Sequence, residues 1–353
     1  MKKDKETRSI CFDDILLVPQ KSTIPSRATI LTNSQIGNPN QPKSVLRLSS
    51  PFFIAPMEFI SSPSMISEII KFGGVGFIPR LYSLDERISR VRKTIELNGG
   101  PENIGFCISS YEVENIDILN QLDKMGIRIL LMDTALGHLD LVVEATKKLR
   151  SNVSDDTHIM CGNISSYEAY ESLMNAGADS IRVGIGGGAA CLTRIVTGFG
   201  VPTLSSIMDI YEKVQGDSIN GIVADGGIKN HGDAVKAFAA GASGVMMGSF
   251  FSGHEECERD EKGNHVFRGL ASKESQINQN PEAINNLKFL HVEGASAEKV
   301  FSKGPVRNSL QMLDNNMRSG MSYCGSPDLK HFRENSTYIE VSSQTYIESN
   351  KRI

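Results

Sequence analysis

The stretch HIMCGNISSYEAYESLMNAGADSIRVGIG, residues 158–186, decides the fold. It opens with an apolar run and closes with another, SIRVGIG at 180–186. Between them lies a segment with helical spacing that starts near Ser166 and stops at Gly177. Serine favours the position before the first turn of a helix, and glycine favours the position after the last. Two strands joined by a helix are typical of a parallel sheet.

The same alternation repeats along the chain, where eight short apolar or β-branched runs are separated by longer stretches that suit helices. The runs are FFIAPM at 52–57, GVGFIPR at 74–80, NIGFCIS at 103–109, IRILLMD at 127–133, HIMCGN at 158–163, SIRVGIG at 180–186, GIVADGG at 221–227 and GVMMGS at 244–249. Eight strand-helix units close into a barrel of about 250 residues before insertions. We therefore predict an α/β fold of the (β/α)8 TIM-barrel class, with residues 1–353 forming one catalytic domain.

Two segments are longer than a minimal barrel repeat requires. A glycine-rich loop at 184–200 follows the sixth strand, and a polar segment of mixed charge at 251–305 follows the eighth. Long loops in compact domains often act as lids over a site. We expect the second segment, called the flap below, to be a mobile cover over the barrel mouth; a solvated surface excursion is the alternative.

The composition narrows the class of protein. The 353 residues are 40% hydrophobic and 22% charged, which provides apolar material for a large core. The net charge of −4 argues against general nucleic-acid binding but allows a local basic pocket for a small anion. No window approaches the roughly 18 apolar residues of a membrane span, and the amino terminus lacks an apolar signal region. We expect a cytoplasmic protein with neither nucleic-acid nor membrane partners.

Cys191 is the candidate nucleophile, because it lies in the glycine-rich loop at the end of the barrel where active sites form. From position alone, a nucleophile and an inert loop residue are equally good interpretations. Cys107 and Cys161 lie inside apolar runs, and we expect them to serve packing. The six cysteines contain no CxxC pair. Four of the seven histidines, His138, His231, His254 and His291, show no metal-ligand spacing among them. The sequence therefore predicts no catalytic metal.

Glycines follow the last two predicted strands, at Gly226 and Gly227 and again at Gly248, which precedes Ser249. The loops after strands seven and eight form the usual phosphate site of TIM barrels, because their backbone N–H groups can approach an anion closely. We expect a phosphorylated ligand there. Asp133, at the end of the fourth run, is either a ribose or cofactor contact or a strand-end cap.

Taken together, several strings resemble the IMP dehydrogenase and GMP reductase family. They are CFDDILLVPQ at 11–20, IAPM at 54–57, MDTALGH at 132–138, CGN at 161–163, NAGADSIRVGIGGG at 175–188, CLTRIVTGFGVP at 191–202, ADGGIKNHGD at 224–233 and MMGS at 246–249. The resemblance implies that Cys191 attacks C2 of a purine nucleoside monophosphate and forms a thioimidate. It also implies a homo-oligomer, commonly a tetramer.

The resemblance further assigns residues to ligands. The substrate, and above all its phosphate, maps onto Asp225, Gly226, Gly227, Gly248, Ser249 and Gly269. A serine that the family places two residues before the cysteine is Ala189 here, so one phosphate hydroxyl is lost. A monovalent cation such as K+ would be held by backbone carbonyls that map to Gly186, Gly188 and Cys191. Arg80 and Asp133 would help to hold the cofactor.

Two features favour the reductase branch. No Bateman regulatory module interrupts the chain after the second strand, and no Arg-Tyr pair, the water-activating dyad of the dehydrogenases, occurs between Phe267 and Gly304. The reductase residues that handle the ammonia leaving group correspond to Thr193 and Glu293. The resemblance thus favours an NADPH-dependent GMP reductase. The alternative is an IMP dehydrogenase using NAD, which the strings IVTGFGVP and SYCG resemble more, and a third possibility is an inactive barrel that binds purine nucleotides.

Overall fold

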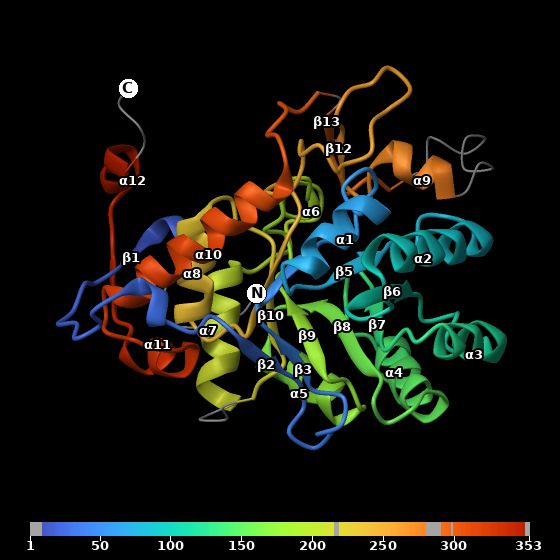
Figure 1. Ribbon diagram of the computed structural model, residues 1–353, viewed down its shortest axis with the longest axis horizontal. Coiled ribbons are helices and arrows are strands. Elements are labelled where there is room, and N and C mark those ends of the chain that lie inside the picture. The colour runs from blue at the N-terminus through green and yellow to red at the C-terminus, as the bar shows by residue number, and fades with distance from the viewer. Residues whose placement is uncertain (1–8, 215–218, 280–290, 298, 350–353) are drawn as a thin grey trace.

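The barrel predicted from the eight apolar runs is present in the computed structural model, which describes residues 9–214, 219–279, 291–297 and 299–349 (Figure 1). Its eight parallel strands follow the order β4-β11-β10-β9-β8-β7-β6-β5. The end strands meet through a parallel bridge between Phe53 and Val75, which closes the sheet. The strands are β4 (Phe52–Ile54), β5 (Gly76–Ile78), β6 (Ile104–Ile108), β7 (Ile129–Asp133), β8 (His158–Ile164), β9 (Ser180–Val183), β10 (Ile222–Asp225) and β11 (Gly244–Met247).

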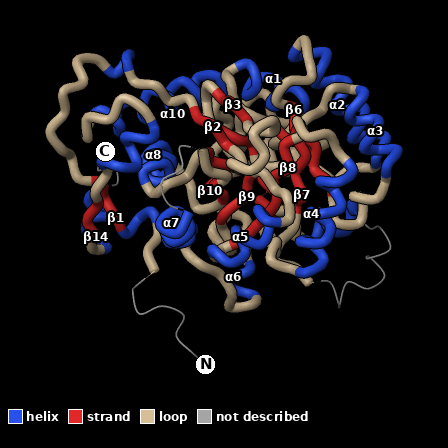
Figure 2. The backbone as a smooth tube through the Cα atoms, turned by 90° about the horizontal axis from the view of Figure 1, so that it is seen from below, coloured by secondary structure: helices blue, strands red, loops and turns tan. Residues whose placement is uncertain are grey.

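A helix follows each strand and packs on the outside of the sheet, as Figure 2 shows from below. The helices are α1 (Pro63–Lys71), α2 (Leu84–Asn98), α3 (Ile116–Lys124), α4 (Asp140–Asn152), α5 (Tyr167–Asn175), α7 (Thr203–Val214), α8 (His231–Ala239) and α10 (Val306–Ser322). The predicted caps are confirmed at α5, where the Ser166 side chain accepts from the backbone N–H of Ala169. Gly177, just beyond its end, has φ +101°, a conformation that favours glycine.

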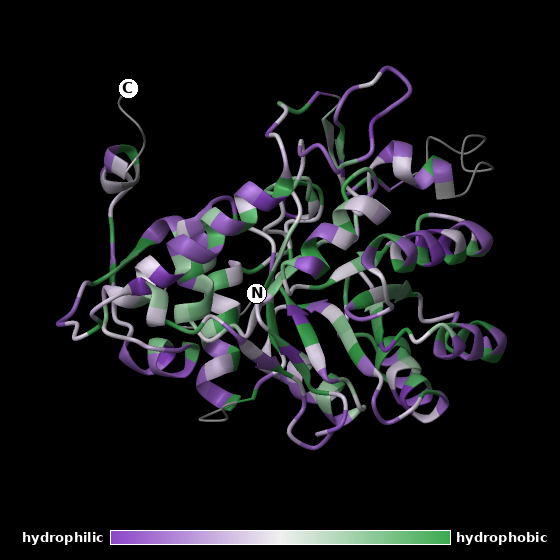
Figure 3. Cartoon of the chain, in the orientation of Figure 1, coloured by the Kyte–Doolittle hydropathy of each residue, from purple (hydrophilic) through white to green (hydrophobic). Residues whose placement is uncertain are grey.

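Alternate side chains of the strands build two separate cores, because successive residues of a strand point to opposite faces. Phe53, Cys107 and Met246 belong to the cluster that fills the barrel. Phe52, Cys161 and Val245 belong to the larger cluster between the strands and the helices. The apolar strands at the centre and the polar outer faces of the helices are visible in Figure 3. Cys107 and Cys161 are therefore packing residues on opposite faces of the sheet.

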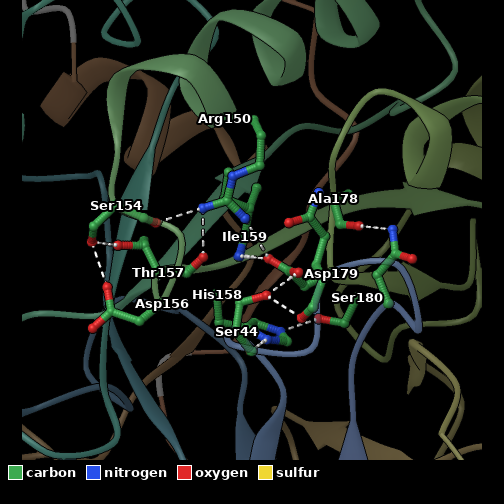
Figure 4. Close-up of polar contacts among 12 residues, drawn as sticks. Ser44, Arg150, Ser154, Asp156, Thr157, His158, Ile159, Ala178, Asp179 and Ser180 are labelled. Carbon is green, nitrogen blue, oxygen red and sulfur yellow. Dashed lines mark hydrogen bonds and ion pairs between the residues drawn. The ribbon is translucent and has the colours of Figure 1, made fainter.

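The lower end of the barrel, where the strands begin, is sealed by a hairpin and a buried polar network. β2 (Ser34–Ile36) pairs with β3 (Leu46–Leu48), and Ile36 packs into the interior cluster. Beside it, the Asp179 carboxylate accepts from Arg150 at 3.1 Å, from the backbone N–H of Ile159 at 2.7 Å and from the Ser44 hydroxyl (Figure 4). Asp179 is fully buried, so this network ties together elements that are distant in sequence.

Further elements surround the barrel. β1 (Ile15–Leu17) pairs with β14 (Tyr338–Glu340). The flap contributes β12 (Phe267–Arg268), β13 (Ser296–Ala297) and α9 (Lys273–Gln279), while its residues 280–290 lie outside the described part. The remaining elements are η1 (Phe12–Asp14), η2 (Arg27–Thr29), α6 (Thr193–Val196), α11 (Leu329–Asn335) and α12 (Ser343–Ser349). Among the helices described, none combines the length and apolar character needed to cross a membrane.

Candidate active site

The cysteine loop leaves the end of β9 and turns back over the barrel mouth. Gly184 and Gly186 both have positive φ values, +146° and +82°, which lets the chain turn sharply. The backbone N–H of Cys191 donates to the carbonyl of Gly188 at 2.9 Å, closing a turn that presents the half-buried cysteine just before α6. The thiol is thus placed at the end of the strands, where TIM barrels carry their chemistry.

The flap is joined to this loop by backbone hydrogen bonds. The N–H of Leu192 donates to the carbonyl of Glu293 at 2.7 Å, and the N–H of Ala295 donates to the carbonyl of Ala190 at 2.8 Å. Cys191 and Gly294 consequently face each other in an antiparallel bridge. In Figure 1, α6 and the flap strands lie beyond the same end of the barrel. Residues about 100 positions apart are brought to one place in this way.

The side chains of the three predicted catalytic residues form a chain. The Cys191 thiol donates to the Thr193 hydroxyl with Sγ–Oγ1 of 3.2 Å, and the Thr193 hydroxyl donates to Oε2 of Glu293 at 2.6 Å. His291, whose position the sequence did not single out for this site, lies with Nε2 2.8 Å from Oε1 of Glu293. The hydrogen bond from Thr193 is the largest cause that lowers the pKa of Glu293 below its usual value; slight desolvation opposes it, and His291 adds a smaller lowering. Glu293 is therefore an anionic acceptor at neutral pH.

The other two cysteines that we assigned to strands have the opposite environment. Both are fully buried. Burial raises the pKa of the Cys107 thiol well above its usual range and raises the pKa of Cys161 to about 12. A thiol that stays protonated is a poor nucleophile. Cys191 is the cysteine of these three that is accessible to a substrate.

A buried charged network lies at the upper end of β5, β7, β9 and β10. Arg182 of β9 donates to Asp133 at 2.6 Å and to Asp225 at 2.8 Å. Arg80 reaches the other oxygen of Asp133 at 3.4 Å, and Asn163 donates to Asp225 at 2.7 Å. Burial alone would lower the pKa of Arg182, but Asp225 and Asp133 raise it above its usual value. Neither Arg182 nor Asn163 was predicted as a site residue; the available signals were a single arginine inside an apolar run and a polar residue near the end of another.

The glycines after β10 and β11 form an open cradle. Gly226 and Gly227 have φ values of +90° and +82°, which other residues rarely adopt. Within the described part of the chain, the backbone N–H groups of Gly227, Gly248 and Ser249 donate to no other residue. A Cβ on Gly248 would lie 2.6 Å from Sδ of Met57, so a side chain there would require the Met57 side chain to move. Unpaired N–H groups at the end of a barrel are suited to an anion.

The remaining predicted residues also lie around the cysteine. A Cβ on Gly269 would lie 3.2 Å from the carbonyl oxygen of Ala190, so the flap approaches the cysteine loop closely at this glycine. Gly186, Gly188 and Cys191 belong to the same turn, and the Gly188 carbonyl already accepts from Cys191 N–H. A carbonyl oxygen has two lone pairs, so the Gly188 oxygen keeps one that could bind a cation such as K+.

One known protein family matches nearly the whole of this chain. Residues 9–352 match the family described as IMP dehydrogenase / GMP reductase domain. The chain belongs to this family. Its members are oxidoreductases that act on purine nucleotides and use nicotinamide cofactors.

Relatives of both branches are similar to the chain. It is 30% identical to inosine-5'-monophosphate dehydrogenase of Borreliella burgdorferi, over 97% of this chain and 96% of the relative. It is 31% identical to GMP reductase 1 of Homo sapiens, over 94% and 95%. It is 35% identical to GMP reductase of Leishmania donovani over 64% of this chain but only 47% of the relative. A GMP reductase structure from Trypanosoma brucei in complex with guanosine 5'-monophosphate shares the fold, with a TM-score of 0.83 at 21% identity over 98% of each chain.

Proposed function

We propose that the protein is a GMP reductase that converts GMP to IMP and ammonia with NADPH. The chain from Cys191 through Thr193 to Glu293 carries this proposal, because it joins a nucleophile to groups that can move a proton. The absence of an Arg-Tyr pair between Phe267 and Gly304 supports it, since a thioimidate without water activation is left for reduction.

The steps follow from these groups. The Cys191 thiol passes its proton through Thr193 to the Glu293 carboxylate while its sulfur adds to C2 of GMP, and the C2–N3 π electrons move to N3. Glu293 then returns this proton through Thr193 to the C2 amino group. The electron pair on N3 re-forms the double bond to C2 as the C–N bond breaks, so ammonia leaves a thioimidate. A nicotinamide cofactor, when bound, would supply the hydride that reduces C2. The C–S bond then breaks with its electron pair on sulfur, which releases IMP and leaves Cys191 as a thiolate that takes up a proton from water.

The nucleotide would lie across the barrel mouth. Its phosphate would accept from the free N–H groups of Gly227, Gly248 and Ser249, with Gly226 shaping the turn and Gly269 completing the wall. Asp225 can only accept hydrogen bonds, so we place its carboxylate near the ribose hydroxyls of that same ligand. Arg80, partly exposed, keeps N–H groups beyond its contact with Asp133, which fits a role in holding the cofactor.

An oligomer would suit the surface beside the cysteine loop. Ile195 and Phe199 are 82% and 76% exposed, which is unusual for large apolar side chains that adjoin a site. We propose that another copy covers them. Analytical ultracentrifugation of the wild type and of Phe199→Asp tests this, because the substitution should shift the protein toward monomers.

The second candidate is an IMP dehydrogenase, favoured by the full-length similarity to the Borreliella burgdorferi enzyme. One pair of assays separates the two. The protein is incubated with GMP and NADPH, and separately with IMP and NAD, while the absorbance of reduced cofactor is followed and the products are separated by chromatography. We expect IMP from the first mixture and little or no XMP from the second. XMP formed faster than GMP is reduced would establish the dehydrogenase instead.

A further inference from the structure

We propose that His291 is a positioning residue of this site, which holds the Glu293 carboxylate in the orientation that Thr193 requires. The kinetic test of this inference rests on the proposed function. The hydrogen bonds from which it is argued are independent of that function. His291 lies at the carboxyl-terminal side of the flap, two residues before Glu293.

The two oxygens of Glu293 have separate partners. Oε2 accepts from the Thr193 hydroxyl at 2.6 Å, and Oε1 lies 2.8 Å from Nε2 of His291. A carboxylate has only acceptor positions, so Nε2 must carry the proton and donate it. A carboxylate bonded at both oxygens cannot rotate without breaking one of these bonds. His291 thereby fixes the oxygen that faces Thr193.

The direction of the hydrogen bonds continues to the thiol. Because the Thr193 hydroxyl donates to Glu293, its oxygen is left to accept from the Cys191 thiol at 3.2 Å. If the carboxylate turned away, the Thr193 hydroxyl would be free to rotate and its proton would point elsewhere. The state of the nucleophile therefore depends on a residue that does not touch it.

His291 is itself held from behind. The side-chain amide of Gln276 in α9 donates to the carbonyl of His291 at 2.8 Å and to the carbonyl of Ala271 at 3.0 Å. The N–H of Glu293 donates to the same Ala271 carbonyl at 3.2 Å. The backbone of both residues is thus tied to one point of the flap, so the ring and the carboxylate keep their relative placement.

An exposed histidine-carboxylate pair is by itself weak, and the chain supplies a matched example. His331 and Asp328 in the α11 region also lie 2.8 Å apart, and His331 is 51% exposed compared with 65% for His291. Asp328 caps its own helix through the N–H of His331. The Asp328 carboxylate thus serves its own helix, whereas the Glu293 carboxylate is hydrogen-bonded to Thr193, which in turn accepts from Cys191. His331→Ala is therefore the control for losing a surface pair.

The test compares His291→Ala, His291→Gln and His331→Ala. Glutamine retains an N–H donor near the position of Nε2 without the ring. We expect His291→Ala to lower kcat for GMP reduction about tenfold with KM for GMP within about twofold, because one charge-assisted hydrogen bond is lost. His291→Gln should return to within about twofold of the wild type, and His331→Ala should match it. Melting temperatures of all variants provide the folding check.

A second readout does not need the reaction. The rate of Cys191 alkylation by iodoacetamide is measured at one fixed pH in the same proteins, with the labelled peptide identified by mass spectrometry. His291→Ala should change this rate by at least about threefold, because a freed Thr193 hydroxyl no longer accepts from the thiol in a fixed orientation, and His291→Gln should restore the wild-type rate. An alkylation rate and a kcat in His291→Ala equal to those of the wild type would overturn the proposal, as would a glutamine variant no better than alanine. If wild-type protein fails to reduce GMP, the proposed function fails, and the alkylation rates still decide the role of His291.

Discussion

Each end of the barrel carries a hydrogen-bonded series of polar side chains. The two series differ in how far they are accessible to solvent and to a ligand. At the lower end, Asp179 is fully buried and accepts from three donors. At the upper end, the chain begins at the half-buried Cys191 and ends at His291, which is largely exposed. A fully buried network can only stabilise, because a ligand cannot reach it. An open chain can exchange a proton with a ligand or with water.

Replacing the nucleophile should have the largest effect. We expect Cys191→Ser to lower turnover of GMP by at least about a thousandfold, because a hydroxyl is far less nucleophilic than a thiolate at neutral pH. Binding of GMP, measured by calorimetry, should persist, and the melting temperature should stay within about 2 °C. Normal turnover by this variant would remove the covalent mechanism.

Cys107→Ser is the matched control for that experiment. Cys107 is fully buried inside the barrel, so a hydroxyl there lacks a partner and should cost about 1–3 kcal/mol of unfolding free energy. Its turnover at a temperature where it is folded should equal that of the wild type. Lost activity at an unchanged melting temperature would place Cys107, rather than Cys191, in the chemistry.

Breaking the lower network should affect stability alone. Asp179→Ala leaves the largely buried Arg150 guanidinium without its carboxylate, which should lower the free energy of unfolding by about 3 kcal/mol. Urea titration measures the change. The kcat for GMP should remain within about twofold, because Asp179 lies at the opposite end of the strands from Cys191. A large fall in kcat without a change in stability would contradict the division between the two ends.

The upper chain should show the reverse behaviour. Glu293→Gln retains the shape of the side chain but not its charge, and we expect kcat to fall about a hundredfold, as is usual when a proton-transfer group is lost. The unfolding free energy should change by less than about 0.5 kcal/mol, since Glu293 lies at the exposed rim. Product analysis should show slower ammonia release from GMP. Unchanged kcat in this variant would make Glu293 a solvated flap residue.

The sequence could predict those parts of the structure that rest on local patterns, but not the contacts that form only when the barrel closes. All eight strands were predicted and are confirmed, because each forms an apolar run long enough to recognise. The β2–β3 hairpin was missed, since its three-residue strands carry a polar residue at the centre, Gln35 and Arg47. Position in the sequence predicted the cradle glycines at the upper end. The partners of Asp133 were not predicted, because Arg182 meets it only after the barrel closes.

The hydrogen-bonded series of Cys191, Thr193 and Glu293 could be predicted only through the family resemblance, because its residues also meet only after the protein folds. Thr193 is two residues from Cys191, so a local pattern was available. Glu293 is 100 residues from Thr193, and no periodicity links them. His291 had no pattern at all, because an isolated histidine in a polar flap is most often a solvated surface residue.

The smallest expected effect is on the pH dependence of the unfolding free energy. It distinguishes the lower end of the barrel from the upper end without removing a side chain. His158 lies in the lower network, where Nδ1 donates to the Ser44 carbonyl at 2.8 Å and Nε2 accepts from the Ser180 hydroxyl at 2.7 Å. Burial lowers its pKa below the usual 6.5, so the folded protein resists a proton that the unfolded chain accepts. Its contribution to stability is fully present above about pH 6.5 and is lost as the pH falls toward the folded pKa. We expect the unfolding free energy to decline by about 1 kcal/mol between pH 6.5 and 5 on this account.

The substitution His158→Asn isolates this contribution, because asparagine can still donate to the Ser44 carbonyl but does not titrate. Other buried histidines with lowered pKa values, His254 and His265, remain in both proteins, so the difference in pH slope between variant and wild type belongs to His158. Glu293 at the upper end has its pKa lowered from 4.5, so the stability that it contributes is lost only below that pH, outside the same window. Urea titrations of both proteins at pH 5, 6 and 7 measure the slopes. Equal slopes would show that His158 is not held neutral by burial, and the lower network would then tolerate a charge in the way the open upper chain does.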